Sequence, residues 1–133
     1  MALMFFDHTA DVGVRVTAAS RPALSREAAL AMTTTVTDPW QVEAVMTRTV
    51  VLRAPDVDQL LVDWLSELVG WFDIDLFLAR STTVALDQHD SDWQMAATAI
   101  GESFDPARHH LKFLVKGVTY HDSHVERTAA GFW

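Results

Sequence analysis

The sequence predicts a two-layer α+β domain, in which two helices pack on a mixed, mostly antiparallel sheet. Three observations predict it: a capped apolar stripe over residues 56–72, strand-like alternation over residues 76–99, and a short strand followed by a helix over residues 12–34. A chain of 133 residues, half of them hydrophobic, suits one domain with a real core. We therefore treat residues 1–133 as a single domain.

The clearest element is a helix that begins after Asp56. Asp56 is a helix-capping residue, and Gln59 follows it at the capping-box spacing. The apolar residues that follow recur at helical spacing and form one wide stripe: Leu60, Leu61, Trp64, Leu65, Leu68, Val69 and Phe72. We read Trp64, Trp71 and Phe72 as core residues rather than as a cofactor site.

The N-terminal part predicts a strand and then a helix. Val12, Val14 and Val16 alternate with small or polar residues, which is typical of a strand with one buried face. Ser20 is a suitable N-cap, and Pro22 falls in the first turn, where a missing N–H costs nothing. We expect this helix to run to about residue 34.

The rest of the chain is rich in predicted strands. We expect a strand over residues 47–53 and a hairpin formed by residues 76–86 and 93–99, with a polar turn over residues 87–92. The next segment, residues 101–106, is predicted to be a loop.

Two further strands are predicted at the C-terminal end, over residues 111–120 and 124–128. In the first, the apolar phase slips by one residue at Lys116-Gly117. A β-bulge produces such a slip, and glycine favours one. A bulge would re-aim Lys116 relative to Lys112 on the same strand.

Composition excludes several classes of function. Ten Lys and Arg stand against eighteen Asp and Glu, and the net charge of −8 repels phosphate backbones. We therefore expect no direct nucleic-acid binding, and an acidic surface that suits a basic protein partner. The absence of cysteine excludes disulfides, thiolate zinc sites and cysteine nucleophiles.

The sequence contains no targeting or membrane-spanning signal. The apolar start, residues 1–6, is short, lacks a preceding basic region and ends at Asp7. No apolar run approaches the length needed to span a membrane. We expect a cytoplasmic protein with no membrane partner.

Four segments together resemble the archease family, in the family's order and over nearly the whole chain. They are His8-Thr9-Ala10-Asp11 with Val12-Gly13, Asp56 to Leu68, Gly101 to Pro106 with Arg108-His109, and Val115-Lys116-Gly117-Val118-Thr119-Tyr120-His121.

This resemblance implies a function. Archeases act with the GTP-dependent RNA ligase that joins tRNA exon halves, promoting guanylylation of the ligase and its multiple turnover. It also implies site residues: Asp11 as a ligand of a divalent cation, calcium in the first place with magnesium or manganese as alternatives, and Lys116 as a functional cation. We expect His8 to fix the loop around Asp11 by a hydrogen bond rather than to bind the cation, because calcium and magnesium prefer oxygen ligands.

The family pattern ends in a strand that closes with an aspartate, another ligand of the cation. This chain ends at Phe132-Trp133, so we expect that the final strand is missing from these residues. A cation held by Asp11 without that carboxylate would bind weakly, since calcium takes six to eight oxygens and magnesium six.

Two other functions stay open at this stage. One is a metal-dependent hydrolase or nucleotide-handling enzyme that uses Asp11 and nearby histidines, although the sequence offers few convergent acid–base groups. The other is a general protein-binding chaperone or adaptor that uses its acidic face. A phosphate-binding glycine loop and a serine elbow are both absent, which favours a protein that is not itself an enzyme.

Other polar clusters are weaker candidates. His121 and His124 form a His-x-x-His pair, but a turn is predicted between them. The acidic residues of segment 87–92 lack the glycine and closing glutamate of a calcium loop, so we read them as a solvated turn. His109 and His110 are read as part of a loop that packs or caps.

Overall fold

The computed structural model describes residues 2–7 and 12–112. Its elements follow in the order β1, β2, α1, η1, β3, α2, β4 and β5. Strands β1 (Ala2–Asp7) and β2 (Val12–Thr17) form an antiparallel pair, with Asp7 opposite Val12. The short 3-10 helix η1 spans Pro39–Gln41.

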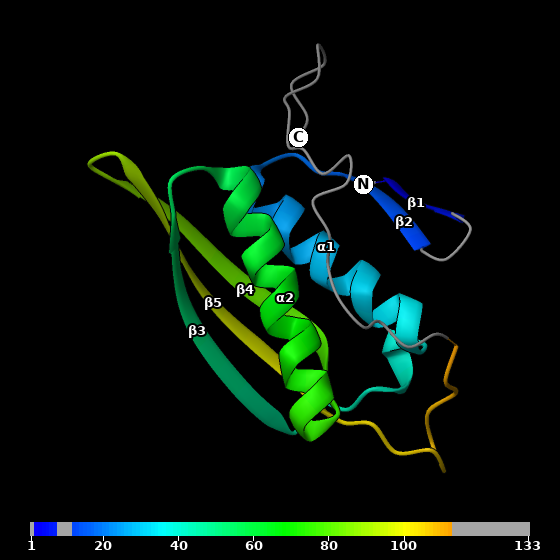
Figure 1. Ribbon diagram of the computed structural model, residues 1–133. Helices are drawn as coiled ribbons and strands as arrows, with labels where there is room; N and C mark the ends of the chain where they lie inside the picture. The colour runs from blue at the N-terminus through cyan, green and yellow to red at the C-terminus, as the bar shows by residue number, and fades with distance from the viewer. Residues whose placement is uncertain (1, 8–11, 113–133) are drawn as a thin grey trace.

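The main body is an α+β arrangement of two helices on a three-stranded antiparallel sheet. The helices are α1 (Arg21–Val36) and α2 (Val57–Asp75), and both cover the same face of the sheet (Figure 1). Strands β3 (Met46–Ala54), β5 (Asp92–Ser103) and β4 (Phe77–His89) lie in the order β3-β5-β4. This confirms the predicted fold class. Neither helix is long and apolar enough to cross a membrane.

The core lies between α2 and the sheet. Trp64 is fully buried, and its Nε1 donates a hydrogen bond to the Ser25 carbonyl oxygen on α1 at 3.1 Å. Its ring meets Trp71 edge to face at a centroid distance of 6.1 Å, and Trp71 meets Phe77 in the same way at 5.7 Å. The predicted stripe of α2 is therefore core, as expected.

Both predicted helix starts are confirmed. The Ser20 side chain accepts a hydrogen bond from the Ala23 N–H at 3.2 Å, and the Asp56 side chain accepts one from the Gln59 N–H at 2.7 Å. Each bond satisfies a backbone N–H that the first helical turn leaves without a partner. α2 ends at Asp75, and its C-cap Leu76 is left-handed with φ of 59°.

The predicted hairpin is confirmed, but its turn is shorter than expected. β4 continues to His89 and β5 begins at Asp92, so most of the polar segment 87–92 belongs to the strands. Asp90 takes the left-handed conformation at φ of 53°, which aspartate tolerates better than most residues.

The prediction of a loop from Gly101 was wrong. Residues 101–103 complete β5, and the loop begins at Phe104. Gly101 lies opposite Ala79, beside the irregular register of β4. A Cβ at Gly101 would lie 1.8 Å from the Leu78 carbonyl oxygen. This glycine therefore allows close approach of two strands rather than a turn.

Two other differences concern the ends of the chain. β1 was not predicted as a strand. Leu111 and Lys112, the start of the predicted strand over residues 111–120, are not in a strand. The rest of that segment and the predicted strand over residues 124–128 lie outside the described residues.

Candidate functional site

The site residues predicted from the sequence, His8, Asp11 and Lys116, lie outside the described residues. The structure describes the segments beside them. β1 ends at Asp7 and β2 begins at Val12, on either side of residues 8–11. Lys112, four residues before Lys116, is the last residue described. His121 and His124 also lie beyond it.

The described residues offer no alternative metal centre. Within residues 16–112, whose side chains the structure describes, no group of three or more histidines and carboxylates is arranged to hold a metal ion. The role of Asp11 as a ligand of a divalent cation stays a prediction.

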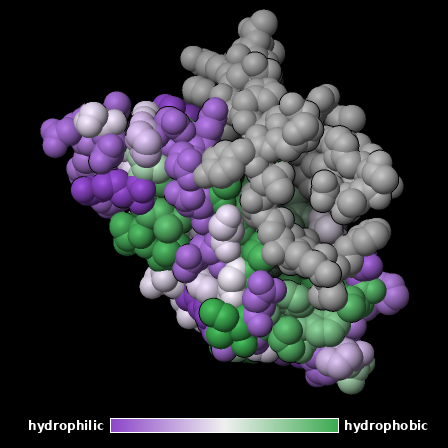
Figure 2. Space-filling view, viewed as in Figure 1, coloured by the Kyte–Doolittle hydropathy of each residue, from purple (hydrophilic) through white to green (hydrophobic). Residues whose placement is uncertain are grey.

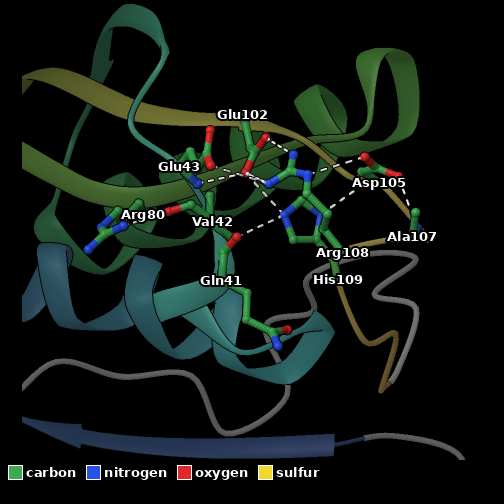
Figure 3. A network of polar contacts seen from close by, with 9 residues as sticks. All are labelled: Gln41, Val42, Glu43, Arg80, Glu102, Asp105, Ala107, Arg108 and His109. Atoms are coloured by element: carbon green, nitrogen blue, oxygen red, sulfur yellow. Dashed lines mark hydrogen bonds and ion pairs between the residues drawn. The ribbon is translucent and has the colours of Figure 1, made fainter.

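The most developed polar site of the described structure is centred on Glu102 at the end of β5 (Figure 3). Glu102 is 5% exposed. Its Oε2 accepts hydrogen bonds from the Glu43 backbone N–H at 2.6 Å and from Arg108 Nη1 at 3.1 Å, and its Oε1 accepts one from Arg108 Nη2. A buried carboxylate needs such partners, and this one has a two-pronged guanidinium.

His109 completes the network from below the carboxylate. Its Nδ1 accepts a hydrogen bond from the Asp105 N–H at 2.8 Å, so in the neutral ring the proton resides on Nε2. That Nε2 faces the Gln41 carbonyl oxygen and Glu102 Oε2, each at 3.1 Å. The ring is buried and lies 5.6 Å from the Phe104 ring. The expectation that His109 packs or caps is confirmed.

The charges of the network stabilise each other. The hydrogen bonds from Arg108 lower the pKa of Glu102 from 4.5 to about 2, against the opposing effect of burial. The hydrogen bond to Glu102 raises the pKa of Arg108. Arg108 also reaches Asp105 at 3.3 Å and Glu43 at 3.8 Å. The pair is ionised throughout the physiological range.

The network ties three segments together. It joins the end of β5 to the loop after η1 and to the turn over residues 105–109. Beyond this turn, the Lys112 N–H bonds the Val36 carbonyl oxygen at 2.8 Å, and its Nζ lies 2.6 Å from Asp38 Oδ1. The chain is therefore fixed to the C-terminal end of α1 four residues before Lys116.

This geometry fixes the position of a chain segment, and the polar groups that hold it are bonded to one another. Glu102 and Arg108 are bonded to each other, and His109 has both nitrogens engaged. A nearby apolar cavity, between α1, α2 and β4, has a volume of about 20 Å³. Lined by Thr33, Leu68 and Phe77 among others, it holds at most a water molecule.

Comparison with known proteins identifies the family. The model of the archease protein family matches residues 4–133. The chain belongs to the archease family. Protein archease of Methanosarcina barkeri is 32% identical over 129 residues, covering 96% of this chain and 88% of that protein. Protein archease of Pyrococcus abyssi is 31% identical over 128 residues, covering 96% and 90%.

A solved structure also matches closely. The solution structure of protein 1598 of Methanobacterium thermoautotrophicum is 32% identical to this archease, with a TM-score of 0.85. The match covers 98% of this chain and 91% of that one. The two-layer fold is therefore shared within the family.

The Glu102 network was not predicted as a unit. The segment that holds it, Gly101 to Pro106 with Arg108-His109, is one of the four that resemble the family, but the sequence assigned no role to Glu102 or Arg108. The signal in the sequence is a glutamate at the end of an apolar strand, followed six residues later by an arginine. A carboxylate at such a place requires a cation nearby.

Proposed function

We propose that this archease activates the GTP-dependent RNA ligase that joins tRNA halves, and that it performs no chemistry alone. The observation that carries the proposal is membership of the family over residues 4–133, together with the four segments that carry the resemblance. The acidic net charge of −8 supports action through a protein partner rather than through RNA.

In this proposal, Lys116 supplies a positive charge toward a phosphate of GTP or a carboxylate of the ligase. The described structure supports a positioning role for the segment before it. Lys112 is held at Val36 and Asp38, and the preceding turn is held by Glu102 and Arg108. Because the chain is fixed at Lys112, the positions that Lys116 can adopt four residues later are limited.

Asp11 would hold the divalent cation that the resemblance implies, and His8 would orient the loop. The cation, when bound, would supply positive charge for phosphates. Asp11 directly precedes β2, whose pairing with β1 sets Asp7 opposite Val12. The ordered strand pair thus bounds the segment that carries both residues.

The described side chains also support a non-catalytic role. The ionised groups at Glu102 engage one another, and the apolar cavity is far smaller than a nucleotide. An independent hydrolase needs an accessible pocket with unengaged acid–base groups. The activator role, in contrast, requires only a positioned surface.

The test is a multiple-turnover ligation assay with the ligase of the same organism, GTP, manganese and tRNA halves. We expect more than one ligated tRNA per ligase molecule when this protein is present and about one in its absence. The Asp11→Ala and Lys116→Ala variants should lose most of the stimulation, while Lys112→Ala, which removes a cation paired with Asp38, should retain more of it.

Unchanged turnover with the wild-type protein would sink the proposal. Nucleotide hydrolysis by the purified protein alone, abolished by a chelator, would instead favour the enzyme hypothesis.

A further inference from the structure

One end of the molecule gathers most of the large apolar side chains that are exposed within residues 16–112, the part of the chain whose side chains the structure describes. Seven large hydrophobic residues are exposed in that range, and six of the seven lie where α1 and α2 end. We call these six the end surface: Trp40, Val45, Met46, Ile74, Leu76 and Leu111.

Contacts between elements bring one part of this surface together. Arg48 forms an ion pair with Asp75, which joins the start of β3 to the end of α2. Met46 lies two residues before Arg48, and Ile74 and Leu76 flank Asp75. The start of β3 and the end of α2 therefore form one corner of the molecule.

Other contacts link the rest of the surface to this corner. Val42, two residues after Trp40, packs against Phe72 of α2. Lys112, next to Leu111, is bound to Asp38, two residues before Trp40. The space-filling view shows hydrophobic residues at the surface around the lower end of the molecule, where α2 ends (Figure 2).

Exposing these apolar side chains to water is unfavourable, and the fold does not require their exposure. Ile74 is 81% exposed, Trp40 72% and Val45 66%. Leu76 closes α2 in the left-handed conformation, where glycine or asparagine is usual, and its side chain points to the surface. A concentration of such residues marks an interaction site.

The charges around the end surface define its partner. Carboxylates outnumber cations around it: Asp38, Glu43, Asp73, Asp75, Glu102 and Asp105 stand against Arg48, Arg80, Arg108 and Lys112. Arg48 pairs with Asp75, Arg108 with Glu102, Glu43 and Asp105, and Lys112 with Asp38, while the exposed Asp73 adds to the excess of negative charge. A second copy of this chain, with its own charge of −8, would be repelled, whereas a basic protein would be attracted.

We propose that the end surface docks the RNA ligase, an inference that rests on the proposed function. A ligase that binds RNA must carry basic surface for phosphates, which complements the acidic rim, while the apolar centre supplies affinity. Leu111 and Lys112 form one side of the surface, so a ligase docked here contacts the chain four residues before Lys116 in the sequence.

The test separates binding from stimulation. Ile74→Ser and Trp40→Ala each remove an exposed apolar side chain from the end surface. Val51→Ser is the matched control, because Val51 is 65% exposed on β3 but lies away from the end surface. Affinity for the purified ligase is measured by calorimetry, and stimulation by titration of the protein into the turnover assay.

We expect Ile74→Ser and Trp40→Ala each to weaken binding to the ligase about tenfold or more. The concentration of this protein that gives half-maximal stimulation should rise by the same factor, while the maximal stimulation is retained. Val51→Ser should match wild type, and added salt should weaken wild-type binding. Unchanged affinity in both end-surface variants, beside stimulation by wild type, overturns the docking site and leaves the activator role standing.

Other outcomes are equally decisive. Wild-type protein that binds through this surface but fails to stimulate would refute the proposed function and keep the docking site. No binding by wild type would refute both. Self-association of this chain that Ile74→Ser abolishes, or direct RNA binding at this surface, would assign it to a different partner and overturn the inference.

Discussion

The two ends of β5 are stabilised in different ways. Along most of the strand, Met95, Ala97 and Ala99 turn buried apolar side chains to the helices. At its end, Glu102 is buried as an ion and depends on Arg108 and on the Glu43 N–H. Apolar packing is non-directional and tolerates many sequences, whereas a buried charge requires particular partners at particular distances. The apolar part of β5 therefore stabilises the core of the domain, and the end at Glu102 holds the neighbouring loops in place.

The largest effect should come from the apolar side of this comparison. Trp64→Ala removes a fully buried ring and its hydrogen bond to Ser25, so the free energy of unfolding should fall by about 3–5 kcal/mol in urea titrations. Trp40→Ala, at a site 72% exposed, should change it by less than about 0.5 kcal/mol. Similar losses in the two variants would contradict the assigned core.

Protein stability should be nearly as sensitive to substitution at Gly101, which lies between the apolar part of β5 and Glu102. In Gly101→Ala the new methyl group would meet the Leu78 carbonyl oxygen at 1.8 Å, so the strands must separate. We expect a loss of about 1–3 kcal/mol in the free energy of unfolding. Gly70→Ala is the control, since nothing lies within 4 Å of its Cβ and alanine favours the helix. A neutral Gly101→Ala would show that β4 and β5 do not approach so closely.

The contribution of Glu102, at the polar end, should appear as a pH dependence of the free energy of unfolding. Because the pKa of Glu102 is lowered from 4.5 to about 2, its ionised form stabilises the fold above about pH 4.5, and this contribution is lost as the pH falls toward 2. Glu102→Gln should lower the free energy of unfolding at pH 7 by about 1–3 kcal/mol and flatten the decline below pH 4.5. An acid profile that is the same in wild type and variant would refute the role of Glu102.

The smallest effect should have the opposite sign. Leu76→Gly places a glycine at φ of 59°, which relieves the strain of a left-handed leucine, and removes a side chain that is 45% exposed, so stability should be unchanged or rise by up to about 1 kcal/mol. Thermal unfolding measures it. A clear loss of stability would mean that Leu76 packs within the fold, and would remove it from the end surface.

The elements predicted well are those set by local rules. Asp56 and Ser20 cap helices through their own neighbours, and the alternation from Trp93 to Ala99 suffices to place a strand. Gly101 was misread because a glycine in a sequence does not say whether it serves a turn or the close approach of two strands. Leu78, the residue that decides, is 23 positions away.

The polar site could be predicted only in part. That His109 caps its own loop follows from nearby residues, and the structure confirms it. That it also meets Gln41, 68 positions away, follows only from the folded arrangement. The roles of Asp11 and Lys116 come from the family resemblance, and they stay predictions that the Asp11→Ala and Lys116→Ala variants test. The role of His8 also stays a prediction.

The most direct measurement of the activator role is guanylylation of the ligase itself. Purified ligase is incubated with labelled GTP and divalent metal, with or without this archease and before any RNA is added, and the covalently bound label is followed in time. The activator role predicts faster and more complete labelling when the wild-type protein is present, and little gain with Lys116→Ala. Labelling that proceeds at the same rate and to the same extent in both cases would contradict it.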